Sequence, residues 1–440
     1  MKVGMINIAF IGGGSPYVPV IVHGLCSSME YNCIKKIVLY DIDILRLEII
    51  SKYCDALIKK FGFEIEISIT NVWDSNLDDL DLFINIFRVG GMESRHYDEL
   101  IGKENNIIGQ ETQGYGGFAS ALRNINLLKT IAPKIKKGSP NALFLNVTNP
   151  SGIMTGAALK LGLNAVGICD VPYGMKKQVA IFANTTAEQL KVSYIGLNHL
   201  GWIIDIEQGG KSIFDSFLNS NNLSNLLALL KQNNIPFPAD CKELVKAINA
   251  LPSSYLTYYY YRDKIIEYQR QEQKTRAQKL IGVNEEIFNF YSSLNLREWP
   301  DFIVEKRGAF LLGEAVAKFI LNKFCFGINT DHIICQRNGN TISWLEEDSI
   351  IETNVLINNS GNIIPQKIEI PICDHIKSLM QMVSAYENLT IDAGINMDKE
   401  KMLEALVTHP LVTTFELSKT LVDKTLQIHS KYLYNNGLYY

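Results

Sequence analysis

The stretch INIAFIGGGS, residues 6–15, decides the fold because an apolar run ends there in three glycines and a serine. The apolar run predicts a buried β-strand, and the apolar-patterned stretch VPVIVHGL (18–25) predicts a helix directly after the turn. Glycines between a strand and a helix let backbone amides approach a phosphate group closely. This part of the chain therefore predicts a strand–turn–helix unit that can bind a phosphate.

Strand and helix signals alternate along the first half of the chain. Further strands are predicted at KKIVLYDID (35–43), DLFINIF (81–87), NALFLNVTNP (141–150) and NAVGICD (164–170), with helical stretches at 46–61 and 120–135 between them. This alternation predicts an α/β fold with a doubly wound parallel sheet, in which ligands bind beyond the carboxyl ends of the strands. We expect residues 1–195 to form such a Rossmann-like domain.

The second half has a different pattern. Long helical stretches at 240–295 and 308–323 mix with strand-like runs such as DHIICQRN (331–338), and the last helices are expected at 398–433. We therefore expect residues 196–440 to form an α+β domain.

The composition excludes several classes of protein. A net charge of −4 over 440 residues argues against a nucleic-acid-binding surface, which would be basic. No apolar run has the length of a membrane span, and the first residues do not have the pattern of a signal peptide. The cysteines are scattered without a CxxC pair, which is typical of cytosolic thiols. We expect a cytoplasmic enzyme with no nucleic-acid or membrane partner.

The first turn and the second strand predict a nucleotide site. Gly12, Gly14 and Ser15 are the candidate phosphate contacts, although Tyr17 occupies the position of the last glycine in the dinucleotide motif. Asp41 ends the second strand, where a carboxylate can bind ribose hydroxyls and repel a 2′-phosphate. The combination favours NAD over NADP as the cofactor.

Two further motifs are candidates for chemistry. CDVPYG (169–174) places Cys169 beside Asp170 at the end of a predicted strand, where the thiol could be a nucleophile, a metal ligand or a packing residue. YIGLNHLGW (194–202) places His199 in a turn. One sulfur and one imidazole nitrogen near the nucleotide can hold a divalent metal, but the spacing alone does not decide between these three roles.

Several long motifs together carry a family resemblance. They are IAFIGGGSPYVP, YDID, RVGGMESRHYDE (88–99), IGQETQGYGGFASALRNI (108–125), NVTNPSG (146–152), GICDVPYGM (167–175), GLNHLGW (196–202) and YLTYYY (255–260), and they span about the first 60% of the chain. The sequence resembles the NAD- and manganese-dependent glycoside hydrolases of family 4, which do not use the two-carboxylate mechanism of most glycosidases. RVGG, QETQGYGGF and GLNHLGW look closest to the 6-phospho-β-glucosidases.

The resemblance implies residue roles. Cys169 and His199 correspond to ligands of a Mn²⁺ ion, and Tyr255 corresponds to the catalytic base. Substrate-binding roles fall on Arg95, Asn149 and Arg276. The tyrosines at 258–261 stand beside Tyr255, so the family motif alone does not separate them.

The resemblance also implies a mechanism and an assembly. NAD⁺ takes a hydride from C3 of the sugar, the base removes the acidified C2 proton, the aglycone leaves C1, water adds, and the hydride returns. The second domain would then carry substrate and metal contacts as well as the interface of a homo-oligomer, a dimer or a tetramer.

Asp170 departs from the β-like pattern. Relatives that act on β-linked 6-phosphoglucosides usually have Asn after the metal cysteine, whereas those that act on α-linked ones have Asp, a candidate general acid. We therefore predict a 6-phospho-β-glucosidase, with a 6-phospho-α-glucosidase as the alternative. An NAD-dependent dehydrogenase of the malate type and a catalytically silent nucleotide-binding regulator would also share the nucleotide fold.

Overall fold

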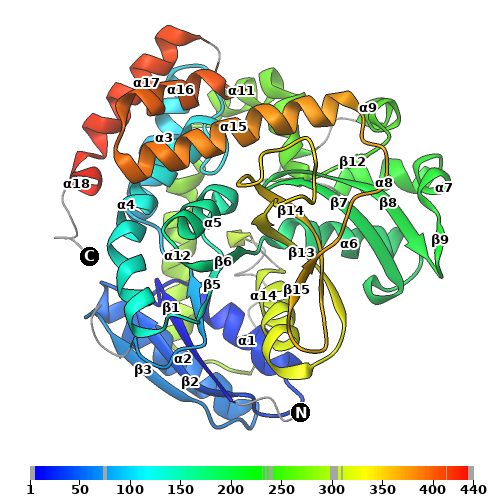
Figure 1. Cartoon of the computed structure of the whole chain (residues 1–440). Helices are drawn as coiled ribbons and strands as arrows, with labels where there is room; N and C mark the ends of the chain where they lie inside the picture. Colours follow the sequence, from blue (N-terminus) through cyan, green and yellow to red (C-terminus); the bar gives the residue numbers. More distant parts are fainter. Residues whose placement is uncertain are drawn as a thin grey trace.

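A nine-stranded sheet forms the centre of the computed structural model (Figure 1). The structure describes residues 5–72, 77–229, 231–232, 235–236, 241–297, 306–308, 311–412 and 414–434. Six parallel strands come from the first half: β1 (Ile6–Ile11), β2 (Ile34–Tyr40), β3 (Glu66–Thr70), β4 (Leu82–Asn85), β5 (Leu143–Asn146) and β6 (Asn164–Gly167). Their spatial order is β3-β2-β1-β4-β5-β6, which is that of dinucleotide-binding folds. The predicted Rossmann-like sheet is confirmed.

Three antiparallel strands from the second half extend this sheet. They are β13 (Thr330–Arg337), β14 (Ile350–Ile357) and β15 (Ile363–Pro365), and β13 joins the parallel part beside β6. The strand predicted at 331–338 is thus confirmed. The edge strand β3 has no counterpart in the sequence prediction, because its side chains are half-buried and polar residues alternate along it.

Helices cover both faces of the sheet because successive strand residues point to opposite sides. Ile8 and Phe10 of β1 pack in one apolar cluster, whereas Ala9 and Ile11 pack in the other. The first cluster includes residues of α1 (Val18–Ser28), α2 (Ile44–Lys60), α12 (Arg276–Ser292) and α14 (Leu312–Leu321). The second includes residues of α4 (Gly114–Gly138), α5 (Ser151–Lys160) and α15 (Asp374–Asn396), while α3 (Gly91–Glu104) packs between α4 and α12.

A second, antiparallel sheet stands at one side of the molecule (right in Figure 1). It is built on a hairpin of β7 (Leu190–Leu197) and β8 (Leu200–Gln208), with the short strands β9 (Lys211–Ser212) and β12 (Leu251–Pro252) paired to β8. The neighbouring elements in sequence are α6 (Asp170–Phe182), α7 (Phe214–Leu218), α8 (Asn221–Leu229), β10 (Lys231–Gln232), β11 (Ile235–Pro236) and α9 (Cys241–Ile248).

The stretch predicted as helical at 240–295 is interrupted. It contains α9, β12, a 3₁₀ turn at Ser254–Leu256, α10 (Thr257–Tyr260), α11 (Arg262–Gln271) and α12. The interruption comes from tertiary pairing, because Leu251 and Pro252 lie opposite Ile203 and Trp202 of β8. Of the helix predicted at 308–323, residues 309 and 310 lie outside the described part of the chain, and α14 begins at Leu312.

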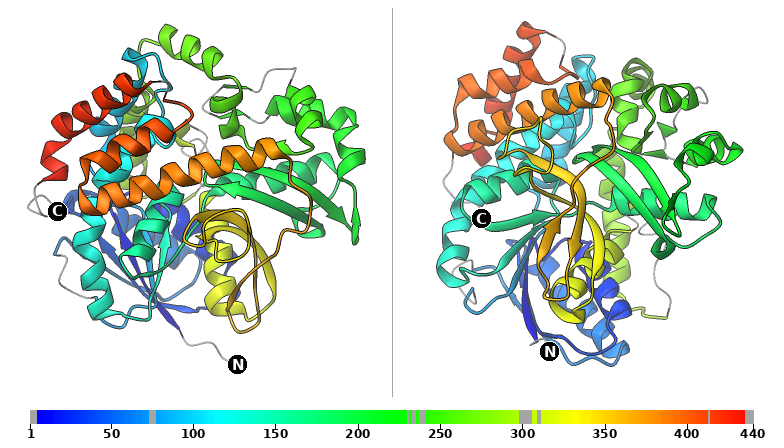
Figure 2. Two further views of the ribbon diagram at one scale, coloured as in Figure 1. Left: turned by 45° about the horizontal axis from the view of Figure 1, so that its top comes forward. Right: turned by 45° about the vertical axis from the view of Figure 1, so that its right-hand side comes forward.

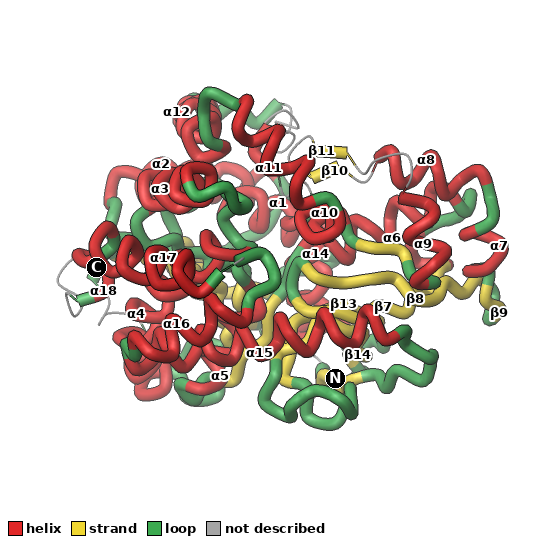
Figure 3. Tube along the Cα trace, turned by 90° about the horizontal axis from the view of Figure 1, so that it is seen from above, coloured by secondary structure: helices red, strands yellow, loops and turns green. Residues whose placement is uncertain are grey.

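The last helices pack back on the body, as predicted. They are α16 (Lys399–Thr408), α17 (Phe415–Ile428) and α18 (Ser430–Leu433), preceded by α15. Figures 2 and 3 show α16 and α17 on the side of α4 and α5, away from the β7–β8 hairpin. Within the described ranges, the helices are too short or too polar to cross a membrane.

Candidate active site

One cavity of about 1710 Å³ opens at the carboxyl ends of the parallel strands. Residues that follow five of these strands line it: Gly12 after β1, Asp41 after β2, Arg88 after β4, Asn149 after β5 and Cys169 after β6. The structure brings every predicted site residue to this cavity, namely Gly12, Gly14, Ser15, Asp41, Arg95, Asn149, Cys169, Asp170, His199, Tyr255 and Arg276. A cavity at this edge of the sheet is the expected ligand site.

The glycine turn forms one end of the cavity. Gly12 has φ +93°, and a Cβ on it would lie 2.6 Å from the amide nitrogen of Phe87, so the turn requires glycine. The amide of Gly14 donates to Asp41 Oδ2 at 2.9 Å, and the amide of Asp43 donates to Oδ1 at 3.1 Å. Burial raises the pKa of Asp41. Asp41 is therefore fixed against the turn, at the place where a ribose would meet the second strand.

Cys169 and His199 meet in the same cavity. Cys169 precedes α6, and its Sγ lies 3.3 Å from Nε2 of His199 in the turn between β7 and β8. His199 has φ +63°, a conformation that non-glycine residues adopt rarely and that is often found at functional sites. Both side chains are buried, and Asp170 Oδ1 lies 4.0 Å from the sulfur.

The electrostatics of this pair favour uncharged donors. Burial raises the pKa of Cys169 well above its usual value, and burial lowers the pKa of His199 to about 3. Burial also raises the pKa of Asp170 to about 6. A neutral imidazole suits a divalent first-row metal, and the sulfur would bind it once the thiol has released its proton. Within the described ranges no three His, Cys, Asp or Glu side chains cluster as metal ligands, so this pair leaves further positions of a metal open.

Tyr255 lies against the histidine. The two rings are stacked, with centroids 3.6 Å apart and an interplanar angle of 11°. Tyr255 lines the cavity, and its hydroxyl forms no hydrogen bond with any described residue. By contrast, the hydroxyl of Tyr259 donates to Gln113, and that of Tyr260 accepts from the indole of Trp202. Among the described tyrosines of 255–261, Tyr255 alone lines this cavity.

Asn149 also presents an unused polar atom. Its Oδ1 is buried without a hydrogen-bond partner in the described structure, and the residue lines the cavity. The loop around it is held in place, because the hydroxyl of Thr148 donates to the carbonyl of Phe87 and the amide of Ser151 donates to Asn198 Oδ1. An orphan buried oxygen in a fixed loop is suited to a ligand that donates a hydrogen bond.

A buried ion-pair network surrounds Arg95. Its Nε donates to Glu99 at 2.7 Å, and its Nη1 lies 2.8 Å from Glu111 Oε2. Arg88 lies 2.6 Å from the same oxygen, although neither contact with Glu111 has hydrogen-bond geometry. Burial acts to raise the pKa of Glu111, but Arg88, Arg95 and Arg307 outweigh it and bring the pKa to about 2. Two carboxylates therefore already neutralise much of the charge of Arg95.

Two other arginines at the cavity form no salt bridge with a carboxylate among the described residues, although Arg307 lies near enough to Glu111 to lower its pKa. Arg276 donates to the carbonyl of Lys306 at 2.9 Å, and Arg307 lies over the ring of Tyr17 at 5.0 Å. The Nε of Arg307 is buried without a hydrogen-bond partner. Sequence reasoning gave Arg307 and Glu111 no role, because only the fold brings them to Arg95. Arg88 carried a signal, its place at the end of a predicted strand.

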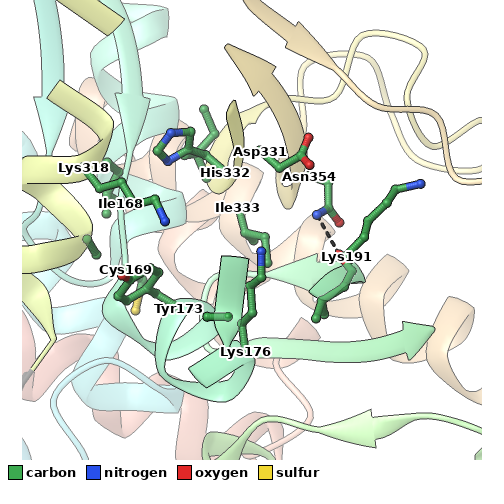
Figure 4. Close-up of a pocket in the computed structure, with 14 residues that line it drawn as sticks. Ile168, Cys169, Tyr173, Lys176, Lys191, Lys318, Asp331, His332, Ile333 and Asn354 are labelled. Atoms are coloured by element: carbon green, nitrogen blue, oxygen red, sulfur yellow. Dashed lines mark hydrogen bonds between the residues drawn. The ribbon is translucent and has the colours of Figure 1, made fainter. Parts of the chain in front are cut away.

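A second, smaller cavity lies behind Cys169 (Figure 4). Its volume is about 50 Å³, and Lys176, Lys318, Asp331 and His332 are among the residues that line it. This volume holds a few water molecules and is too small for a nucleotide or a sugar phosphate. The large cavity is therefore the candidate active site.

Comparisons with known proteins cover nearly the whole chain. The model of the family 4 glycosyl hydrolases matches residues 7–185, and that of their C-terminal domain matches residues 194–412. The 6-phospho-beta-glucosidase BglT of Thermotoga maritima is 30% identical over 97% of this chain and 99% of its own. A structure of the Thermotoga maritima 6-phospho-beta glucosidase with manganese, NAD+ and glucose-6-phosphate has a TM-score of 0.85 at 28% identity, over 97% of this chain and 99% of that one.

A relative of the opposite anomeric type is similar as well. A structure of a 6-phospho-alpha-glucosidase from gut microorganisms, in complex with NAD and glucose-6-phosphate, has a TM-score of 0.83 at 25% identity. It covers 97% of this chain and 98% of its own. The matches on both halves and the identity over nearly the full length agree with the fold and with the motifs. The chain belongs to family 4 of the glycosyl hydrolases.

Proposed function

We propose that this protein hydrolyses 6-phospho-β-glucosides with the help of NAD⁺ and Mn²⁺. The observation that carries the proposal is the pair of Cys169 and His199, with Tyr255 stacked on the histidine, in the same cavity as the glycine turn and Asp41. The names and bound ligands of the relatives support it, since they include phosphoglucosidases solved with NAD, manganese and glucose-6-phosphate.

NAD⁺ and the metal would bind to different residues of this cavity. Gly12, Gly14 and Ser15 would bind the phosphates of NAD⁺, and Asp41 would accept hydrogen bonds from the ribose hydroxyls. Cys169 and His199 would hold the metal. When bound, the two groups supply reversible oxidation at C3 of the sugar and Lewis-acid stabilisation of the neighbouring oxygens.

The proton transfers fall to two residues of the chain. Tyr255 has a free hydroxyl at the cavity and would remove the proton from C2 of the sugar. Asp170 is half-buried, lies beside Cys169, and would protonate the departing oxygen at C1. Neither residue acts as a nucleophile at C1.

The arginines would recognise the phosphate. Arg276 and Arg307 form no salt bridge in the described structure, and Arg276 gives one donor to the carbonyl of Lys306, so further donors of both remain for a phosphate. Arg95 shares its charge with Glu99 and Glu111 and would contribute a weaker direct contact. The orphan Oδ1 of Asn149 would accept a hydrogen bond from a sugar hydroxyl.

The preference for the β-anomer rests on the motifs RVGG, QETQGYGGF and GLNHLGW, whereas Asp170 favours the α-anomer. A 6-phospho-α-glucosidase is the second candidate, favoured by that one residue and by the similar α-type relative. A panel of α- and β-linked nitrophenyl glycosides, with and without a 6-phosphate, tests both candidates in Mn²⁺, NAD⁺ and reductant. The proposal predicts turnover of the β-linked 6-phosphate alone. Net accumulation of NADH during turnover would instead favour a dehydrogenase.

The proposal also assigns different roles to the two parts of the chain. Residues 1–195 would bind NAD, while 196–440 would supply Tyr255 and Arg276, together with the contacts of a dimer or a tetramer. Cys169 lies in the first part and His199 in the second, so the metal would bridge the two.

A further inference from the structure

A hydrogen-bonded chain leads from His199 away from the cavity. Nδ1 of His199 lies 2.9 Å from Oγ1 of Thr112, and the hydroxyl of Thr112 donates to Gln110 Oε1 at 3.0 Å. All three side chains are buried. Thr112 and Gln110 belong to the loop before α4, and no sequence motif gave them a role.

The orientation of the Gln110 amide is fixed by its partners. The backbone amides of Thr112 and Gln113 point at Oε1, at 2.6 and 2.8 Å. Backbone amides can only donate, so the atom that they meet must be the oxygen. The loop itself is held close to α4, because a Cβ on Gly116 would lie 1.9 Å from the carbonyl oxygen of Gln110.

Which atom donates and which accepts in each hydrogen bond follows from the acceptors at the two ends of the chain. If the hydroxyl of Thr112 donates to Gln110, its oxygen can only accept from Nδ1–H of His199. Nε2 then has a free lone pair, which can accept from the thiol of Cys169 at 3.3 Å. The opposite direction would leave that thiol only Asp170, at 4.0 Å. The first arrangement gives the ring proton of His199, the hydroxyl proton of Thr112 and the thiol proton of Cys169 an acceptor within 3.3 Å.

We infer that Thr112, held by Gln110, is a positioning residue that fixes His199 in the tautomer protonated on Nδ1. This tautomer turns the lone pair of Nε2 toward Cys169, where a divalent metal would bind. Such partners behind a metal-binding histidine orient the ring and raise its affinity for the metal. The metal in this inference rests on the proposed function, whereas the tautomer of His199 does not depend on it.

The first test needs no metal and no activity. Nitrogen NMR of metal-free protein with labelled histidine shows which ring nitrogen of His199 carries the proton, with His199→Ala as the assignment control. We expect Nδ1–H in the wild type and in Thr112→Ser, which keeps the hydroxyl. In Thr112→Val we expect a shift to Nε2–H, because Nδ1 loses its acceptor. A wild-type His199 protonated on Nε2 overturns the inference, whether or not the variants fold.

The second test measures Mn²⁺ affinity directly, by electron paramagnetic resonance of the free ion. Thr112→Val should bind Mn²⁺ about 10- to 100-fold more weakly, and Thr112→Ser should bind like the wild type. Thr425→Val is a matched control, because it removes another buried threonine hydroxyl, which contacts Tyr115 and the carbonyl of Leu421 and does not line the large cavity. Equal affinity in Thr112→Val and the wild type contradicts the positioning role. Failure of the wild type to bind Mn²⁺ contradicts the proposed function instead, and the tautomer measurement still decides the inference.

Discussion

The ring of Tyr255 is stacked on the imidazole of His199, with centroids 3.6 Å apart. The stacking places the candidate base directly against a candidate metal ligand, so proton removal and metal binding would share one wall of the cavity. Burial raises the pKa of Tyr255 well above its usual value in the metal-free protein. A cation held beside the ring would oppose this effect by favouring the charged form of the phenol.

Replacement of Tyr255 by phenylalanine separates the hydroxyl from the ring. Tyr255→Phe keeps the ring that stacks on His199 and removes the hydroxyl that would accept the C2 proton. We expect kcat to fall by about 10²- to 10⁴-fold, while the affinities for Mn²⁺ and NAD⁺ stay within experimental error. Steady-state kinetics and binding titrations check both parts. A variant with wild-type kcat would show that Tyr255 is a packing residue.

Tyr260 provides the matched control for that experiment. Its hydroxyl accepts from Trp202 and contacts His375, outside the large cavity. Tyr260→Phe should cost about 1 kcal/mol of stability through the lost hydrogen bond and leave kcat unchanged.

Removal of a metal ligand should weaken metal binding without unfolding the protein. His199→Ala and Cys169→Ser each delete one of the two donors that lie 3.3 Å apart. We expect each to lower the affinity for Mn²⁺ by at least about 10-fold, because even a supporting residue behind a ligand contributes that much. Circular dichroism checks the fold. The ligand assignment is wrong if both variants titrate like the wild type.

Arg276 and Arg95 should have different roles, the first in recognition of the substrate and the second in stability of the fold. Arg276→Met should raise KM for the phosphorylated substrate and change the stability little, because Arg276 forms no salt bridge in the described structure. Arg95→Met should instead destabilise the protein by about 3–5 kcal/mol, since it leaves Glu99 and Glu111 buried with fewer cations. Kinetics and thermal unfolding measure the two effects. Equal stability of both variants would contradict the division.

Glu387 should make the stability depend on pH. Burial raises the pKa of this carboxyl from 4.5 to about 8, and its Oε2 has no hydrogen-bond partner in the described structure. The folded state then binds the proton more tightly than the unfolded state, so stability falls as pH rises from about 4.5 to about 8 and is level above that range. A difference of one between the pKa values of the folded and unfolded states corresponds to about 1.4 kcal/mol of stability.

Glu387→Gln removes this titration. Denaturant unfolding between pH 5 and pH 9 (roughly the window set by the pKa difference) should show the variant gaining stability relative to the wild type as pH rises. Parallel stability curves for the two proteins would mean that Glu387 titrates normally in the folded state.

The sequence alone was sufficient for five of the six parallel strands, with β3 as the exception, and for the residues that follow their carboxyl ends. Cys169 and Asp41 each follow an apolar run directly, Asn149 comes three residues after β5 ends, and the carboxyl ends of parallel strands meet at one edge. His199 was found through its turn motif, although the strand pairing that forms the turn is a tertiary feature.

The residues that the sequence did not predict depend on tertiary contacts. Arg307 and Glu111 lie far from Arg95 in the sequence or on another element, and their charges act on Arg95 and on each other only in the fold. Thr112 has no distinguishing pattern, because its role lies in one hydrogen bond to His199. The helix expected around residue 251 is broken because Leu251 and Pro252 pair with β8.

The central claim is that the chemistry passes through C2 of the sugar rather than through C1 alone. Ordinary glycosidases act only at C1 and the leaving oxygen, and they leave the C2–H bond intact. Turnover in D₂O, with the sugar phosphate trapped as it is released, measures this directly by NMR of the product. The account predicts deuterium at C2 in the wild type and slow turnover in Tyr255→Phe. Released product that carries only hydrogen at C2 would contradict the elimination mechanism for this protein.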